Sequence, residues 1–420
     1  MSMKVKYLKG PPYDDLKASI SGGFIIFFCH YFYFSIFTMN FGTYKMIRKI
    51  SRSYLTGGKL LRRSFFTHFF RTSENKNNSF ATENASIKDL LDSSVVVEEN
   101  KRVSEEQKRR RIVLLLCQIQ QGMGKKLLHY PNVIDMYERA SEILGYDILQ
   151  ISIDGPESQL TQTSYQQPAI LLASLAAVEK LREEDLEAVA MCEATAGFSV
   201  GEIAALTFAG SITFENAVQL VKIRAEAMQI ASELHRSGMM TVFYGPESKL
   251  SYACSVAKRY CETIGMEDVD CRVANYLFPH CKVIAGNEEA LEFILKHKDD
   301  FKLKRFKRID VSGAFHTDLM KPAAFAFQEA LKNVSITHPQ IPVISNVTGA
   351  PFKNVTDIKK QLSKQIYSPV RWEQTVHRIY ERKENKPYPR TFECGPGKSL
   401  CSILKMVNAK AHKFCYNVEV

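Results

Sequence analysis

Apolar and polar positions alternate regularly from residue 112 onward. Residues 112–116 (IVLLL) form a short continuous apolar run, which is typical of a buried strand. Residues 168–181 have the pattern of an amphipathic helix, and residues 188–196 are expected as a strand that leads into a tight turn. Helices are expected at 201–210 and 215–234. Strands that alternate with helices in this order predict an α/β domain with a largely parallel sheet.

The pattern changes between about residues 236 and 308. There the expected order is strand, helix, strand, strand, helix, strand, at residues 239–244, 248–264, 272–277, 282–285, 287–297 and 303–309. This βαββαβ order is ferredoxin-like. The α/β pattern then returns, with a strand at 343–347, helices at 357–366 and 372–382, and a strand–turn–helix at 391–406. We therefore predict a large α/β-hydrolase-like subdomain (111–235 and 309–420) that carries an inserted ferredoxin-like small subdomain (236–308).

The N-terminal part is not patterned like a domain. Residues 24–37 are an apolar aromatic run, shorter than the roughly 20 residues of a membrane span and interrupted by His30. From Met46 the chain is rich in Arg, Lys and Ser, and residues 18–73 contain no Asp or Glu. This composition predicts a mitochondrial transit peptide within residues 1–73, with Met46 or Met39 as a possible true start and a linker and helix at 74–110. A disordered basic tail and a signal anchor remain alternatives.

The net charge of +11 at first suggests an anionic partner such as nucleic acid. However, twelve Lys and Arg against two Asp give residues 1–73 a charge of +10, which leaves +1 for the rest of the chain. We therefore expect no nucleic-acid partner and no stable membrane insertion. The ten cysteines show no CxxC pair and no zinc-ligand spacing, so we expect reduced thiols and no metal site.

A candidate nucleophile stands between the predicted strand at 188–196 and the predicted helix at 201–210. Gly197-Phe198-Ser199-Val200-Gly201 fits the G-x-S-x-G elbow. The turn is so tight that a Cβ at either glycine would clash, and the helix N-terminus would direct the Val200 N–H at a developing oxyanion. His316, in a loop of small residues, is the candidate base, although a loop histidine taken alone is more often a surface residue.

Five segments in order carry a family resemblance: ATAGFSVGEIAAL, VKIRAEAM, SGAFHTDLMKP, QIYSPVRWEQT and ECGPGKSL. Together they resemble the malonyl-CoA:acyl carrier protein transacylase family, most of all its mitochondrial members, over about residues 110–415. The resemblance implies transfer of malonyl from coenzyme A to the phosphopantetheine thiol of acyl carrier protein through a malonyl-serine. It implies no metal and no tightly held cofactor, and a setting in fatty acid synthesis in the mitochondrial matrix.

The resemblance also implies roles for single residues. Ser199 would attack the thioester and His316 would act as its base, oriented by the main chain of Gln365. Arg224 would bind the free carboxylate of malonyl, because a guanidinium matches a carboxylate bidentately. From the residues alone, Arg224 could equally be a surface helix residue paired with Glu226 or Glu202. Asn275 matches an asparagine near the mouth of the family's site.

Two further residues concern specificity and the oxyanion. Phe315 precedes the histidine, a position where the family's malonyl-specific members have Phe, and it would disfavour a methyl branch on the acyl group. The family's second oxyanion donor comes from a P-G-Q-G-S-Q loop after the first strand. Here that strand is followed by the shorter Cys117-Gln-Ile-Gln-Gln-Gly-Met-Gly124, in which Gln118 is the nearest candidate donor. The Gly395-Pro-Gly397 turn is expected to be structural.

A basic strip lies close in sequence to the histidine loop and comprises Lys302, Lys304, Arg305, Lys307 and Arg308. It would attract an acidic carrier protein, or it could be an edge strand protected by charges. Two other functions stay open. One is a serine thioesterase or hydrolase that shares the elbow, and the other is a pseudoenzyme that binds carrier protein with a damaged oxyanion loop.

Overall fold

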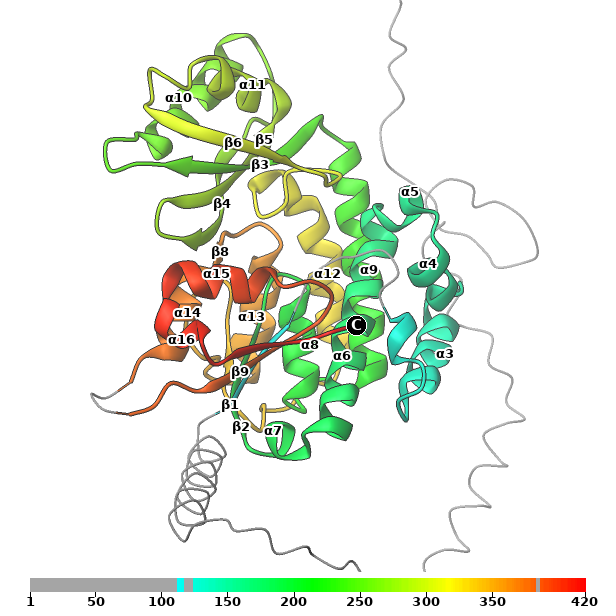
Figure 1. The fold of residues 1–420 in the computed structure, drawn as a ribbon. Helices are drawn as coiled ribbons and strands as arrows, with labels where there is room; N and C mark the ends of the chain where they lie inside the picture. Colours follow the sequence, from blue (N-terminus) through cyan, green and yellow to red (C-terminus); the bar gives the residue numbers. More distant parts are fainter. Residues whose placement is uncertain (1–111, 117–123, 383–385) are drawn as a thin grey trace, which may run out of the picture. The chain divides into compact units, whose positions relative to one another are not determined.

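The computed structural model describes residues 112–116, 124–382 and 386–420 (Figure 1). The predicted targeting region at 1–73, the predicted linker at 74–110 and Gln118 lie outside these residues. None of the described helices is long and apolar enough to cross a membrane.

The large subdomain is built on a parallel sheet, as the sequence predicted. Its strands stand in the order β10–β9–β1–β2–β7, and every neighbouring pair is parallel. The strands are β1 (Ile112–Leu116), β2 (Cys192–Gly197), β7 (Val343–Ile344), β9 (Arg390–Cys394) and β10 (Cys415–Val418). Because the carboxyl ends of parallel strands meet at one edge, residues that follow β2 and β7 come together there.

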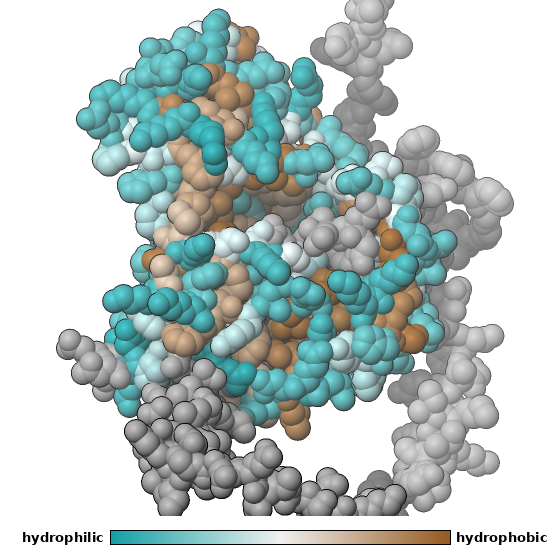
Figure 2. Space-filling model, viewed as in Figure 1, coloured by the Kyte–Doolittle hydropathy of each residue, from teal (hydrophilic) through white to brown (hydrophobic). Residues whose placement is uncertain are grey.

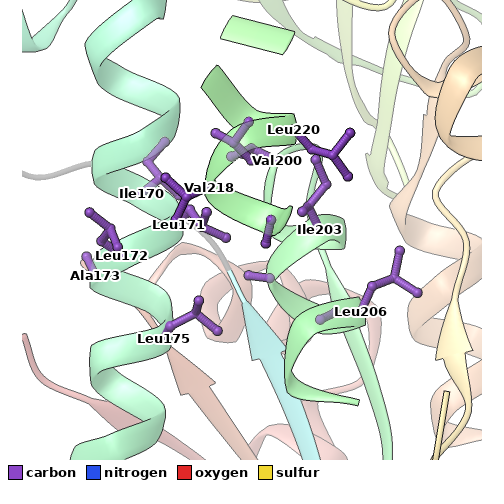
Figure 3. Close-up of a cluster of buried hydrophobic side chains, with 14 of the residues drawn as sticks. Ile170, Leu171, Leu172, Ala173, Leu175, Val200, Ile203, Leu206, Val218 and Leu220 are labelled. Atoms are coloured by element: carbon purple, nitrogen blue, oxygen red, sulfur yellow. The ribbon is translucent and has the colours of Figure 1, made fainter. Parts of the chain in front are cut away.

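Helices connect and cover this sheet. They are η1 (Lys125–Leu127), α3 (Val133–Leu144), α4 (Ile148–Asp154), α5 (Glu157–Leu160), α6 (Thr163–Glu184), α7 (Leu186–Ala190), α8 (Gly201–Phe208), α9 (Phe214–Glu233), η2 (Asp318–Met320), α12 (Lys321–Asn333), α13 (Val355–Gln365), α14 (Trp372–Tyr380), α15 (Ser399–Val407) and α16 (Ala409–His412). Figure 3 shows side chains of α6, α8 and α9 packed into one apolar cluster, with Val200, directly before α8, and Ile203, within α8, among them. The core therefore fixes the start of α8, where the candidate nucleophile stands.

Two local predictions need correction. Residues 186–190 form α7, and the strand begins only at Cys192, because the Asp185 side chain accepts a hydrogen bond from the Ala188 N–H and starts a helix. The helix predicted at 168–181 as amphipathic is α6, and residues 167–178 of it are all buried. It crosses the core with both faces covered.

The small subdomain confirms the ferredoxin-like prediction. Its elements are β3 (Ser237–Tyr244), α10 (Leu250–Thr263), β4 (Cys271–Phe278), β5 (Cys281–Asn287), α11 (Glu288–Lys296) and β6 (Leu303–Ile309). The sheet order is β6–β3–β5–β4, with antiparallel neighbours. A further strand, β8 (Val370–Arg371), pairs in parallel with β4. Because β8 comes from the 309–420 segment, that segment contributes to both sheets.

The cysteines differ in part from the expectation of reduced thiols. Cys401 of α15 and Cys415 of β10 form a disulfide, so the expectation is wrong for this pair. Their Cα atoms lie 6.1 Å apart, a separation that a disulfide can span. The sequence separation of 14 residues gave no signal of this contact, since the fold alone brings α15 beside β10.

Candidate active site

Ser199 stands at a strand–helix elbow between β2 and α8. Its backbone has φ 52°, in the left-handed region that non-glycine residues rarely adopt. A Cβ at Gly197 would lie 1.8 Å from the carbonyl oxygen of Gly201, so the first glycine of the motif is a steric requirement. The strained turn raises the serine side chain out of the sheet edge, as a nucleophile elbow does.

Asn346, which follows β7, holds this elbow in place. Its Oδ1 accepts a hydrogen bond from the Ser199 N–H at 2.7 Å, and its Nδ2 donates to the Gly197 carbonyl at 2.7 Å. The side chain is fully buried. The strained backbone of Ser199 is therefore fixed from the neighbouring strand, by a residue that the sequence reasoning did not identify.

His316 contacts the nucleophile directly. Its Nε2 lies 3.0 Å from Ser199 Oγ, and its Nδ1 lies 2.8 Å from the main-chain oxygen of Gln365. A carbonyl can only accept, so Nδ1 carries the ring proton and Nε2 is free to accept the serine proton. The histidine backbone also has a left-handed φ of 63°, and its N–H donates to the Ile366 carbonyl at 3.1 Å. The predicted serine–histidine–carbonyl arrangement is present.

The environment of His316 keeps the ring neutral. Burial lowers the pKa of His316 to about 4, and the positive charge of Arg224 acts in the same direction. Hydrogen bonds with the main chain of Gln365 and Ser368 oppose this shift. A neutral imidazole at neutral pH is the form that a general base requires.

Arg224 extends from α9 into the same site. The residue is only 1% exposed, which contradicts its interpretation as a surface helix residue. Its Nη2 donates to Ser199 Oγ at 3.1 Å and to Gln365 Oε1 at 2.8 Å, while its Nη1 donates to Gln167 Oε1. A cation is thus held within hydrogen-bonding distance of the nucleophile.

Glu202 lies behind the nucleophile, in the first turn of α8. It is fully buried, and its carboxylate accepts hydrogen bonds from the Asn346 N–H at 2.6 Å and from Gln365 Nε2. Burial raises the pKa of Glu202 to about 7, although hydrogen bonds to Asn346 and Gln365 and the charge of Arg224 favour its ionised form. Gln365 also donates to the Ser199 carbonyl at 2.8 Å, so one amide connects the elbow, the arginine and this carboxylate.

The described residues include one of the two predicted oxyanion donors. Val200 precedes α8, and its N–H has no hydrogen-bond acceptor within the described residues. A free N–H at a helix N-terminus can stabilise an oxyanion. Gln118, the candidate for the second donor, lies in the 117–123 segment outside the described structure.

Asn275 and Phe315 are the two other residues predicted to contact the substrate. Asn275, on β4 beside β8, is buried, and its Oδ1 has no hydrogen-bond partner among the described residues. Phe315 is half-buried and packs against the core of the large subdomain. Neither forms a hydrogen bond or ring contact with Ser199, His316 or Arg224 in the described structure.

The predicted basic strip lies on β6, the edge strand of the small sheet, except for Lys302, which directly precedes that strand. Lys302 pairs with Glu247 at 2.6 Å, and Arg308 pairs with Glu288. Lys304, Arg305 and Lys307 are exposed, and the guanidinium of Arg305 lies 4.4 Å from the centre of the Phe243 ring. On the face seen in Figure 2, hydrophilic residues outweigh hydrophobic ones over this subdomain.

Asn346 and Gln167 were missed, and Glu202 was considered only as a surface partner of Arg224, because each acts across a long sequence separation. Asn346 and Ser199 are 147 residues apart, and Gln167 and Arg224 are 57 apart. A weak signal existed for Glu202, since an acidic residue in the otherwise apolar helix GEIAALTF needs a buried partner. Phe198, directly before the nucleophile, packs edge-on against Trp372 with ring centres 5.4 Å apart.

A serine at a strand–helix elbow, a neutral histidine and a buried arginine define the class: a serine acyl-transfer enzyme on an α/β fold. The acyl transferase domain model matches residues 118–387. The probable mitochondrial malonyl-CoA-acyl carrier protein transacylase of Drosophila melanogaster is 48% identical over 297 residues, covering 71% of this chain and 78% of the relative. The human mitochondrial enzyme of the same name is 49% identical over 299 residues, covering 71% and 77%. The chain belongs to the malonyl-CoA-acyl carrier protein transacylase family.

Solved structures agree with this assignment. An acyl carrier protein S-malonyltransferase from Vibrio cholerae matches with a TM-score of 0.65 and 31% identity, over 74% of this chain and 97% of that one. A malonyl-transacylase in complex with a type II polyketide-synthase acyl carrier protein matches with a TM-score of 0.64 and 30% identity, over 74% and 96%. The predicted fold and family are confirmed.

Proposed function

We propose that this chain transfers malonyl from malonyl-CoA to the phosphopantetheine thiol of acyl carrier protein through a malonyl-Ser199 intermediate. The observation that carries the proposal is the position of Ser199 Oγ, 3.0 Å from His316 Nε2 and 3.1 Å from Arg224 Nη2. Base and cation meet at one hydroxyl, as attack on an acyl group with a free carboxylate requires. The relatives from fly, human and mouse are named mitochondrial, and this chain is a mitochondrial member of the family.

The first half-reaction forms the acyl-enzyme. His316 Nε2 takes the hydroxyl proton while Ser199 Oγ attacks the thioester carbonyl. The negative charge that develops on the carbonyl oxygen is stabilised by the Val200 N–H and by a second donor, for which Gln118 is the candidate. Collapse of the tetrahedral intermediate breaks the C–S bond, and the departing CoA thiolate receives the proton from His316.

The second half-reaction reverses these roles. The phosphopantetheine thiol of the carrier protein gives its proton to His316, and its sulfur attacks the malonyl ester. The tetrahedral intermediate expels Ser199 Oγ, which recovers the proton. Side chains and main-chain groups of this chain serve as base, acid and oxyanion donors, so the proposed mechanism needs no metal and no tightly bound cofactor.

Arg224 selects the acyl group in this proposal. Its guanidinium already donates to three oxygens, of Ser199, Gln365 and Gln167. The malonyl carboxylate would replace part of this set with a stronger, charge-assisted pair. Phe315 next to the base would disfavour a methyl branch, a modest preference of roughly 10–200-fold. Asn275, whose buried amide oxygen has no hydrogen-bond partner among the described residues, would contact the substrate at the site's mouth.

The proposed compartment is the mitochondrial matrix, where the reaction would supply malonyl groups for fatty acid synthesis. The composition of residues 46–73 supports this placement, because an Arg- and Ser-rich segment without acidic residues is typical of a transit peptide. Release of a cleaved mature form in matrix extracts, with an N-terminus located by sequencing, would test it. A full-length form retained in membranes would contradict it and favour the signal anchor.

The decisive experiment compares the acceptors of the acyl group. Purified protein is given malonyl-CoA with holo acyl carrier protein, and malonyl-carrier and free malonate are measured together. We expect malonyl-carrier to form far faster than malonate. Faster release of malonate would identify a thioesterase, and the absence of both products would identify a carrier-binding pseudoenzyme.

A further inference from the structure

A buried carboxylate lies behind the nucleophile and is not used in the mechanism above. Glu202 is 0% exposed and follows Ser199 by one helical turn. One carboxylate oxygen accepts from the Asn346 N–H at 2.6 Å, and the other accepts from Gln365 Nε2. A buried carboxylate is costly unless it is hydrogen-bonded, so these two partners account for its presence.

Both partners of Glu202 reach groups that react or bind substrate. Asn346 accepts from the Ser199 N–H through Oδ1. Gln365 accepts from Arg224 Nη2 through its side-chain Oε1 and from His316 Nδ1 through its main-chain oxygen. Because Gln365 Nε2 donates to Glu202, the carboxylate fixes which end of the Gln365 amide faces Arg224.

We propose that Glu202 is a positioning and specificity residue, which orients Gln365 toward Arg224 and, when ionised, competes with the substrate carboxylate for the charge of Arg224. The proposal rests on the proposed role of Arg224 in malonyl binding. It adds that the preference for malonyl depends on the protonation state of a residue that never touches the substrate.

Arg224 is the charged group that links Glu202 to the substrate carboxylate. Arg224, from α9, supplies the positive charge that acts on Glu202. His316, from the loop before η2, is the titratable group on the other side of Gln365, and it is neutral at neutral pH because burial lowers its pKa to about 4. The remaining groups that touch the carboxylate, from Asn346, Gln365 and Ser345, are uncharged. When malonyl binds, two carboxylates therefore share one guanidinium.

The sign of the pH dependence follows from this arrangement. The pKa of Glu202 lies near 7 in the free protein, so the residue changes its charge across the neutral range. The malonyl carboxylate, as a second anion at Arg224, disfavours the ionised form of Glu202. Binding of malonyl is therefore linked to uptake of a proton by Glu202. The kcat/KM for acyl-enzyme formation from malonyl-CoA should therefore fall as the pH rises through about 7. The kcat/KM for acetyl-CoA, whose acyl group has no free carboxylate, should not show this fall.

The test measures the ratio of kcat/KM for malonyl-CoA to kcat/KM for acetyl-CoA, by acyl-enzyme formation, from about pH 6 to about pH 8.5. Titration of His316 affects both donors equally and cancels in the ratio. We expect the wild-type ratio to fall roughly fivefold over this range, the lower end of typical coupling between two sites. Glu202→Gln should remove the fall. Glu202→Asp should keep the fall but lower kcat for both donors, because the shorter side chain cannot reach both partners.

A matched control is available in the same chain. Glu393 is also fully buried, its pKa is also raised to about 7 by burial, and it accepts hydrogen bonds from the Leu400 and Cys401 N–H groups at the start of α15. Glu393→Gln should keep the wild-type fall in the ratio. Thermal melting of each variant checks that it is folded. If Glu202→Gln does not fold, Glu202→Asp tests the positioning role through kcat, and an unchanged kcat for both donors would overturn it.

The outcomes separate this proposal from the one on which it rests. If Arg224→Ala leaves the malonyl-to-acetyl ratio unchanged, Arg224 does not bind the carboxylate and the proposed function of that residue fails. If Arg224→Ala abolishes the preference while the wild-type ratio is flat with pH, or falls equally in Glu202→Gln, only the proposal for Glu202 is overturned.

Discussion

At the scale of single residues, the arginine beside the nucleophile gives the sharpest prediction. Arg224→Lys keeps the charge but replaces the planar fork by a point donor that cannot hold Gln167, Gln365 and a carboxylate together. Loss of one charge-assisted hydrogen bond costs about 1.5–3 kcal/mol, so kcat/KM for malonyl-CoA should fall roughly 10- to 100-fold. Steady-state kinetics with Arg139→Lys, at a half-buried arginine of α3, as control would check this, and an equal loss in both variants would contradict it.

The base makes a second prediction at this scale. Because the pKa of His316 is lowered to about 4, the ring accepts a proton at every pH above that value. The rate of acyl-enzyme formation should therefore show its acid limb near pH 4, measured by brief pH jumps in single-turnover experiments. An acid limb near the ordinary histidine pKa of about 6.5 would show that His316 is exposed to water in the working enzyme.

The sequence identified the site residues that lie in a recognisable local motif. It did not identify those whose role depends on a partner far away in the chain. Ser199 stands in a motif whose first glycine, Gly197, is required by the turn itself, and the family pattern located His316, Arg224 and Gln365. Glu202 and Asn346 act over 144 residues of sequence, so only the fold reveals that they meet. Asn275 and Phe315 are placed by the structure, but their roles stay predictions.

At the scale of elements, β6 and its cations make the third prediction. Lys304→Glu together with Arg305→Glu reverses two exposed charges on an edge strand, so it should slow transfer to acyl carrier protein while malonyl-Ser199 still forms from malonyl-CoA. The matched control is Lys258→Glu with Arg259→Glu on α10, in the same subdomain. Equal loss in both half-reactions, or the same effect from the control, would argue against docking on β6.

The spacing of apolar residues predicted most helices and strands, because their apolar faces are buried as expected. It was wrong where a single side chain starts a helix within an apparent strand. The strand expected from residue 188 begins at Cys192, since Asp185 caps a short helix ahead of it. β8 was missed as a strand because its two residues, Val370 and Arg371, are too few to show a period. Its pairing with β4 depends on the assembled small sheet.

At the scale of the whole molecule, Trp372 connects the two sheets to the site. It follows β8 directly, is fully buried in a cluster with Leu115 of β1, and contacts Phe198 beside the nucleophile. Trp372→Ala should destabilise the fold by about 3–5 kcal/mol, as large-to-small core substitutions do, and should lower activity as well. Urea unfolding would measure the loss against Phe325→Ala, whose side chain is 72% exposed and should matter little. Similar losses in both variants would contradict this role.

The central claim is that Ser199 carries the malonyl group between coenzyme A and the carrier protein. Intact-mass measurement of the purified protein after incubation with malonyl-CoA, without carrier protein, tests it most directly. We predict a gain of one malonyl group, located on the peptide that contains Ser199, lost on addition of holo acyl carrier protein and absent from Ser199→Ala. No added mass in the wild type, or an equal gain in Ser199→Ala, would contradict the account.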